Sequence, residues 1–189
     1  MLGHTHVLFG LTTVVALERV TPFIQSHPIE GVPVGMALCL GAATVGALLP
    51  DIDAENSTIK TELGLAGRFL GGLMRLVGIK HRGLTHWGIT TVVVSLATII
   101  GGAAWGAFDI GLAFALGYIS HTAIADAMTI QGVPLLWPRR KAFHLFPKPF
   151  RVRTGGPVEQ IIFFVMLLVF VSLIPGLITP EMLGLVVRA

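Results

Sequence analysis

The sequence predicts an all-α protein: a polytopic membrane bundle of about five transmembrane helices with one short interfacial helix. Two observations predict this class. Of the 189 residues, 53% are apolar and 12% are charged, whereas a soluble domain carries roughly 25% charged residues. Several runs also lack charge for long enough to cross the core of a bilayer, which takes about 20 helical residues. A soluble helical protein with a large core fits this composition less well.

We expect one integral-membrane domain over residues 1–189, because the chain shows no internal repeat, low-complexity tract or linker. The start, MLGHTHVLFG, has no Lys or Arg before its apolar run and is a poor signal peptide, so we expect it to be a retained first helix. Pro50 stops the second helix, residues 89–105 of the third carry no charge, and Pro175 bends or ends the fifth. The predicted spans are residues 4–23, 33–49, 86–105, 110–130 and 158–177.

A different pattern separates the second and third spans, at about residues 60–80. Six apolar side chains can share one helix face there, while Arg68 and Arg75 share another. This pattern is typical of a helix that lies in the membrane surface. The apolar residues are Leu63, Phe69, Leu70, Leu73, Met74 and Val77.

The distribution of basic residues predicts the orientation. Five crossings place residues 50–85 and the loop at about 131–157 on the same side as the N-terminus, and these segments hold eleven of the thirteen Lys and Arg residues. The positive-inside rule makes that side cytoplasmic. A phosphate-binding site would attract the same cations, so the bias has two explanations.

The same topology gathers acids and histidines at the cytoplasmic end of the bundle. Taken singly, each has an ordinary role as a cap, a turn former or a partner of the helix dipole. His121 and Asp126, however, lie inside an apolar run, where ionisable residues are costly and indicate function. The residues that converge are His4, His6, Asp51, Asp53, His81, His86, His121, Asp126 and Glu159.

This set of side chains predicts a metal site. Imidazole and carboxylate together suit zinc, manganese or iron, and the single cysteine, Cys39, provides no thiolate set. About seven ligands exceed the four of one tetrahedral zinc, so two or three ions fit the number better.

The spacing of His121 and Asp126 sets a condition on that prediction. Five residues on a regular α-helix turn the two side chains about 140° apart. They can face one centre only if the helix carries a π-bulge or unwinds between them. Otherwise the two residues do not share a site.

Four stretches carry a family resemblance: LLPDID, HRGLTH, GYISH and D-x-x-T-x-x-GVPLLWP. With them the chain resembles the YdjM-like family of inner-membrane-associated metal-dependent hydrolases of bacteria, over nearly its whole length. The resemblance implies a bacterial cytoplasmic membrane protein, distantly similar to the zinc-dependent phospholipase C and single-strand nuclease superfamily. Such enzymes cleave phosphoesters with a zinc cluster. The implied positions are His6, Asp51, Asp53, His81, His86, His121, Asp126 and Glu159.

The chain departs from the family pattern at two places. The family commonly has His-x-x-x-Asp in the fourth helix, whereas this chain has one residue more, His-Thr-Ala-Ile-Ala-Asp. Where the family often has His-Pro after PDID, this chain has Ala54 and Glu55. The first departure bears on the shared face of His121 and Asp126, and the second removes one candidate ligand.

The leading hypothesis is a membrane-embedded metal-dependent hydrolase of a lipid or lipid-linked phosphoester, with two or three zinc ions or manganese that acidify a water molecule and clamp the ester. Asp53 would act as general base or orient a liganding histidine. Arg82 would hold a phosphate oxygen or simply face lipid, and Arg151 and Arg153 would contact substrate. The expected metal ligands are His6, Asp51, His81, His86, His121, Asp126 and Glu159.

Two other functions remain open from the sequence. A metal-ion or proton carrier usually has repeated halves and polar groups at the membrane midplane, which this sequence lacks. A non-catalytic membrane protein with a structural metal site would use the same ligands as an enzyme. We expect no nucleic-acid partner, because the basic residues lie close to the membrane and no soluble basic domain is present.

Overall fold

A computed structural model describes residues 1–29, 32–54, 64, 72, 83–136 and 141–176. The interfacial helix predicted at about residues 60–80 lies outside the described residues. His81, Arg82 and residues 137–140 of the basic loop also lie outside the described residues.

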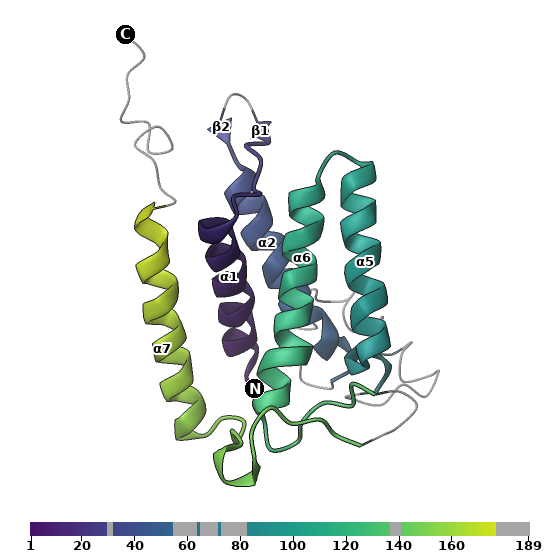
Figure 1. Cartoon of the computed structure of the whole chain (residues 1–189), viewed down its shortest axis with the longest axis vertical. Coiled ribbons are helices and arrows are strands. Elements are labelled where there is room, and N and C mark those ends of the chain that lie inside the picture. Colours follow the sequence, from purple (N-terminus) through teal and green to yellow (C-terminus); the bar gives the residue numbers. More distant parts are fainter. Residues whose placement is uncertain (30–31, 55–63, 65–71, 73–82, 137–140, 177–189) are drawn as a thin grey trace.

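Long helices lying side by side form the body of the molecule (Figure 1). Their bounds agree with four of the five predicted spans to within a few residues, and the fourth span, 110–130, is reached by α6 (Phe108–Ile119) together with the π and 3₁₀ turns that follow it. The all-α prediction is confirmed. The only strands in the described residues are a two-residue antiparallel pair, β1 (Pro28–Ile29) and β2 (Val32–Pro33), between the first two helices. The helices are α1 (Gly3–Val20), α2 (Gly35–Leu48), α5 (Gly88–Ala104), α6 (Phe108–Ile119) and α7 (Pro157–Leu173).

Two helices continue past their α-helical part. The α-helix α2 ends at Leu48, in agreement with the predicted stop at Pro50, and Pro50 lies in the first turn of a 3₁₀ helix, Leu49–Asp53, where its missing N–H costs nothing. After α6 the chain forms a π-helix, Ser120–Ala125, and a 3₁₀ turn, Asp126–Met128. These extensions lie at the end of the bundle where α1 begins (Figure 1).

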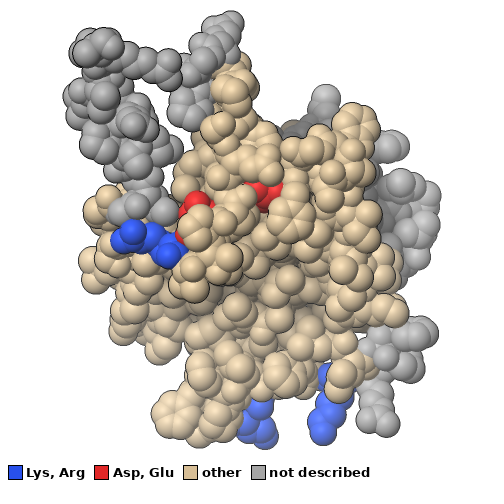
Figure 2. Space-filling view, turned by 45° about the horizontal axis from the view of Figure 1, so that its top comes forward, with Lys and Arg blue, Asp and Glu red and all other residues tan. Residues whose placement is uncertain are grey.

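By length and composition, two helical segments of the described chain could each cross a membrane: Gly35–Ile52 and Phe108–Met128. Gly88–Ala104 and Pro157–Leu173 are apolar but shorter. Five crossings therefore stay a prediction. The exposed apolar side chains of α5 and α7 suit a lipid environment: Val93 is 59% exposed and Leu168 is 71% exposed. Figure 2 shows charged side chains toward the two ends of the molecule, with an uncharged band between them.

Small residues let the central helices approach closely. A Cβ atom added to Gly117 of α6 would lie 2.2 Å from the carbonyl oxygen of Ala43 in α2, and one added to Gly46 would lie 2.2 Å from that of Phe114. On the α5 side, a Cβ atom at Gly111 would lie 2.2 Å from the Thr98 carbonyl oxygen. Packing of this kind is typical of helices in membranes, where small residues at the interface bring backbones together.

A hydrogen bond between Asp109 and His27 stabilises the opposite end of the bundle. Asp109, at the start of α6, accepts a hydrogen bond from the Gln25 amide at 2.8 Å, and its carboxylate lies 2.8 Å from Nε2 of His27. These contacts hold the segment before β1 in place next to the start of α6. Asp109 and His27 therefore lie far from the predicted metal ligands, as their positions in the topology predict.

Candidate metal centre

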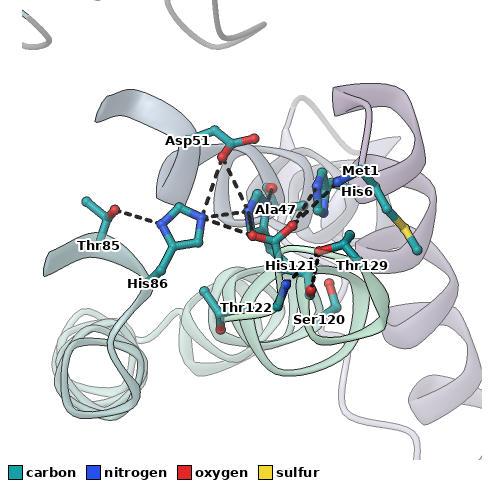
Figure 3. A network of polar contacts seen from close by, with 12 residues as sticks. Met1, His6, Ala47, Asp51, Thr85, His86, Ser120, His121, Thr122 and Thr129 are labelled. Carbon is teal, nitrogen blue, oxygen red and sulfur yellow. Dashed lines mark hydrogen bonds and ion pairs between the residues drawn. The ribbon is translucent and has the colours of Figure 1, made fainter. Parts of the chain in front are cut away.

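Three segments bring imidazoles and carboxylates together at the end of the bundle where α1 begins (Figure 3). The 3₁₀ helix after α2 carries Asp51, and the short 3₁₀ helix η2 (Leu84–His86), which precedes α5, carries His86. The π-helical end of α6 supplies His121 and Asp126. The sequence separates these residues by up to 75 positions, so only the tertiary fold makes them neighbours.

The π-helix meets the condition set by the spacing of His121 and Asp126. The backbone N–H of Asp126 donates to the carbonyl oxygen of His121, five residues earlier. Because a π-helical hydrogen bond spans five residues rather than four, His121 and Asp126 come close to one turn apart. Their side chains therefore meet on one face, with Nε2 of His121 3.9 Å from Oδ2 of Asp126.

Asp51, His86 and His121 form one candidate metal group, and Asp126 lies next to it. Nε2 of His86 lies 3.3 Å from Nε2 of His121, 3.3 Å from Oδ2 of Asp126 and 3.5 Å from Oδ1 of Asp51. Nε2 of His121 lies 3.6 Å from the same oxygen of Asp51. A tetrahedral zinc ion bound at 2.0–2.2 Å requires its ligands to be roughly 3.3–3.6 Å apart. The distances among Asp51, His86 and His121 lie in this range, whereas Oδ2 of Asp126 lies 3.9 Å from Nε2 of His121.

The far side of the His121 ring favours metal binding through Nε2, and a hydrogen bond on the far side of the His86 ring holds its orientation. Nδ1 of His121 is 2.6 Å from the carbonyl oxygen of Ala47, which can only accept, so Nδ1 carries the proton and Nε2 keeps a lone pair. Nδ1 of His86 lies 3.0 Å from Oγ1 of Thr85. Hydrogen bonds of this kind fix the ring orientation of metal-binding histidines.

Tyr118 supports the turn that carries His86. Its hydroxyl group is buried and donates to the carbonyl oxygen of Thr85 at 2.6 Å, across 33 residues of sequence. Tyr118 belongs to the helix that also supplies His121, so one helix positions both imidazoles. No role was predicted from the sequence for Thr85, Tyr118 or the Ala47 carbonyl. The one signal for Tyr118 is that the only tyrosine of the chain lies three residues before His121.

The electrostatics of the centre require a positive charge. Burial lowers the pKa of the His86 imidazole, but hydrogen bonds to the Asp126 and Asp51 carboxylates outweigh burial and raise that pKa to about 9. The two carboxylates therefore stabilise a positive charge at this position, which can be a proton on His86 or a divalent cation. A metal ion at this position would displace the proton, since ligating histidines are neutral.

His6 of α1 adjoins this cluster. Its imidazole is 1% exposed and stacks on the ring of His121, with centroids 3.7 Å apart. Its Nε2 lies 3.7 Å from Oδ1 of Asp126. Neither ring nitrogen of His6 has a hydrogen-bond partner in the structure. Since buried polar atoms are nearly always paired, such an imidazole points to an ion or water.

Glu159 lies apart from the candidate metal groups of the described chain, which comprise His6, His121 and Asp126, and Asp51, His86 and His121. Its two oxygens accept hydrogen bonds from the backbone N–H groups of Leu2 and Gly155, at 2.5 and 2.7 Å. Glu159 therefore joins the first turn of α1 to the start of α7. Glu159 accepts backbone hydrogen bonds instead of joining a candidate metal group, because a helix start leaves N–H groups unpaired and favours negative charge.

Of the other predicted site residues, Arg151 and Arg153 lie near the centre, and the rest are described only in part or not at all. His81 and Arg82 lie outside the described residues, and only the backbone of Asp53 is described, at the end of its 3₁₀ helix. Arg151 and Arg153 flank Val152, which is buried and pairs with the segment that follows Asp126 through hydrogen bonds to Met128 and Ile130. The arginines are thus attached to the centre through the backbone, while Arg151 donates to the Phe146 carbonyl oxygen at 3.1 Å.

Comparison with known proteins places the chain in a family. The family model described as YdjM inner membrane protein matches residues 1–181. The chain is 34% identical over 151 residues to proteins named inner membrane protein YdjM from Escherichia coli (strain K12) and Shigella flexneri, which covers 77% of this chain and 69% of each relative. No solved structure matches at a significant level. The chain therefore belongs to the YdjM inner membrane protein family.

Proposed function

We propose that this membrane protein is a metal-dependent hydrolase that cleaves a phosphoester of a lipid or lipid-linked substrate at headgroup depth. The observation that carries the proposal is the close grouping of Asp51, His86 and His121 at one end of the bundle, with Asp126 next to His86. The donor set suits zinc, and manganese is the second choice. A divalent ion held there supplies Lewis acidity, which polarises a phosphoester and acidifies a water molecule.

The burial of the ligands suggests where substrate enters. His86, His121 and Asp126 are at most 1% exposed, whereas the side chain of Asp51 is 21% exposed. Asp51 therefore lies on the accessible side of the centre. A zinc site with four protein ligands is closed and one with three is open, so we assign Asp51 as the ligand most easily exchanged for a substrate oxygen.

The remaining residues have supporting roles in this proposal. Asp53, two positions after Asp51, would orient or deprotonate the attacking water, and Arg82 would hold a phosphate oxygen. Arg151 and Arg153 lie in an exposed segment with Phe146 and Phe150, a composition that favours anionic headgroups. We therefore place the substrate in the lipid headgroup layer and expect no nucleic-acid partner.

We also propose that the helices cross a bacterial inner membrane five times, with the N-terminus and the metal centre on the cytoplasmic side. The parallel and antiparallel arrangement of α1, α2, α5, α6 and α7 supports the number of crossings (Figure 1). The eleven Lys and Arg residues in segments 50–85 and 131–157 support the orientation.

A second candidate function is a non-catalytic membrane protein whose metal stabilises the bundle. The burial of His86, His121 and Asp126 favours it, because structural zinc sites are typically tetrahedral and closed. A structural site predicts that removal of the metal lowers thermal stability, with no phosphoester turnover in any metal state.

The test measures metal content and turnover on the same preparations. The protein would be purified in detergent, its metal content per chain determined, and a panel of phospholipids and polyprenyl phosphates assayed. We expect His86→Ala to lose metal and to lower turnover more than about 100-fold, since even outer partners of metal ligands cost 10–100-fold. Asp53→Asn should keep the metal and lose turnover.

His27→Gln is the matched control, because His27 lies at the opposite end of the bundle and contacts Asp109. It should retain both metal and turnover. Equal metal in wild type and His86→Ala, together with no turnover of any phosphoester, would refute the hydrolase. Loss of metal and of thermal stability in His86→Ala without turnover in the wild type would favour the structural site.

A further inference from the structure

Asp126 presents its two carboxylate oxygens to different neighbours. Oδ2 faces the imidazoles of His86 and His121, at 3.3 and 3.9 Å. Oδ1 faces away from them, 3.7 Å from Nε2 of His6 and 3.4 Å from the amino group of Met1. A carboxylate in this orientation can serve a cation on each side.

His121 cannot bind two ions, although it belongs to both candidate groups. Its Nδ1 hydrogen is committed to the Ala47 carbonyl oxygen, and the one lone pair on Nε2 binds one ion. The ion shared with His86 and Asp51 uses that lone pair. The second group is therefore left with His6 and Oδ1 of Asp126.

The unpartnered state of His6 is the independent observation that points to a ligand. The ring is 1% exposed, and both of its nitrogens lack a hydrogen-bond partner in the structure. Leaving such a group unpaired destabilises the folded protein, so a bound ion or water is favoured there. An exposed histidine two residues earlier, His4, packs instead edge-on against Phe163 at 5.0 Å.

We propose that His6 and Oδ1 of Asp126 bind a second divalent cation, with Asp126 bridging it to the ion held by His86, His121 and Asp51. The inference rests on the proposed metal centre and deepens it. The second site has fewer protein ligands among the described residues than the first, so it binds its ion more weakly and keeps positions for other oxygen ligands. Those positions suit a phosphoester oxygen, because two-metal sites clamp both oxygens of a displacement.

The experiment titrates metal-free protein in detergent with zinc, and separately with Mn²⁺ for electron paramagnetic resonance. Wild type should bind two ions in a tight and a weaker step, and two Mn²⁺ ions bridged by one carboxylate should give a spin-coupled spectrum. His6→Ala should bind one ion, with the tight step unchanged within threefold and no coupled spectrum. His4→Ala is the matched control and should bind two ions with coupling.

The outcomes separate the second site from the centre itself. One ion in wild type and in His6→Ala would overturn the second site and leave the proposed centre intact. No ion in either protein would overturn both. Loss of both ions in a folded His6→Ala protein, checked by its melting temperature, would place His6 in the first site and also overturn the inference. The coupled spectrum of wild type tests the bridge independently of any variant.

Discussion

His86 is the residue at which proton and metal compete. Its Nε2 lies within 3.5 Å of Asp51 Oδ1 and Asp126 Oδ2, and these carboxylates raise its pKa to about 9 despite burial. At neutral pH the metal-free protein therefore holds a proton at the position of the proposed ion. The same two carboxylates stabilise either cation, so binding must show a pH dependence.

We expect zinc binding at pH 7 to release a proton from His86. Because one proton is displaced, zinc affinity should rise about tenfold per pH unit up to about pH 9. Titration calorimetry at pH 7 in buffers of different ionisation enthalpy measures the proton, and repeating it between pH 6 and 9 measures the affinity. An affinity independent of pH over that range would contradict the assignment.

The stability of the metal-free protein should fall as the pH rises, whereas the zinc affinity rises. A raised pKa in the folded state stabilises the fold below the ordinary histidine value of 6.5, and this contribution is lost as the pH rises through about 9. The melting temperature of metal-free protein should therefore fall over that interval. His86→Ala is the control and should lack this contribution.

Two helical elements decide whether the ligands meet. The π-helix Ser120–Ala125 places the side chains of His121 and Asp126 on the same face, through one backbone hydrogen bond that spans five residues. The α2–α6 contact at Gly117 and Ala43 brings Asp51 and the Ala47 carbonyl toward the same imidazole. Each element can be tested by a change of one residue.

Deleting Ala123 should preserve the centre. The deletion leaves His121 and the following Asp four residues apart, about 40° on a regular α-helix, so the π-turn is no longer needed. Inserting one Ala after Ala123 should abolish metal binding, because a spacing of six places the side chains about 120° apart. Metal content and zinc affinity measure both variants, and loss of metal in the deletion variant with retention in the insertion variant would contradict the role of the π-helix.

Gly117→Ala should weaken both the fold and the metal centre. The added Cβ would lie 2.2 Å from the Ala43 carbonyl oxygen, so α2 must move away from α6, at a cost of about 1–3 kcal/mol. Gly101→Ala is the matched control, because nothing lies within 4 Å of a Cβ at Gly101. It should keep or raise stability, since Ala favours helices over Gly by about 1 kcal/mol. Melting temperature and zinc affinity measure both variants, and equal behaviour would refute close packing as the reason for the glycine.

At the scale of the whole molecule, the two ends of the bundle have different chemistry. One end holds the candidate metal ligands and the basic segment around Arg151, and the other holds the Asp109–His27 pair. An uncharged band separates charged ends on the face seen in Figure 2. For such a molecule the positive-inside rule predicts an orientation with the basic end on the cytoplasmic side.

That orientation predicts the accessibility of introduced cysteines. In a Cys39→Ala background, Ile29→Cys in β1 should react with a membrane-impermeant maleimide in intact cells. Lys148→Cys, at the opposite end, should react only after permeabilisation. The natural cysteine is buried and removed to keep the background silent. Reaction of Lys148→Cys in intact cells would reverse or refute the proposed topology.

Sequence alone predicted the helices and the end at which ligands gather. Uncharged runs such as residues 89–105 are local properties, and alternate crossings place His6, Asp51, His86 and Asp126 at one end without any knowledge of packing. The spacing of His121 and Asp126 even predicted that a shared site requires a π-bulge, which the structure contains. These conclusions depend only on residue order and helix geometry.

Only the tertiary structure decided what each side chain contacts. Residue order cannot show that Glu159 accepts the Leu2 and Gly155 amides, that Tyr118 supports the turn of His86, or that Asp126 turns its two oxygens to different histidines. Hydrogen-bond partners depend on side-chain rotamers and on how closely helices approach, which small residues such as Gly117 set over long sequence separations. The hydrophobic pattern therefore determines the helices of the bundle, and the packing of those helices determines which side chains meet in the candidate metal groups.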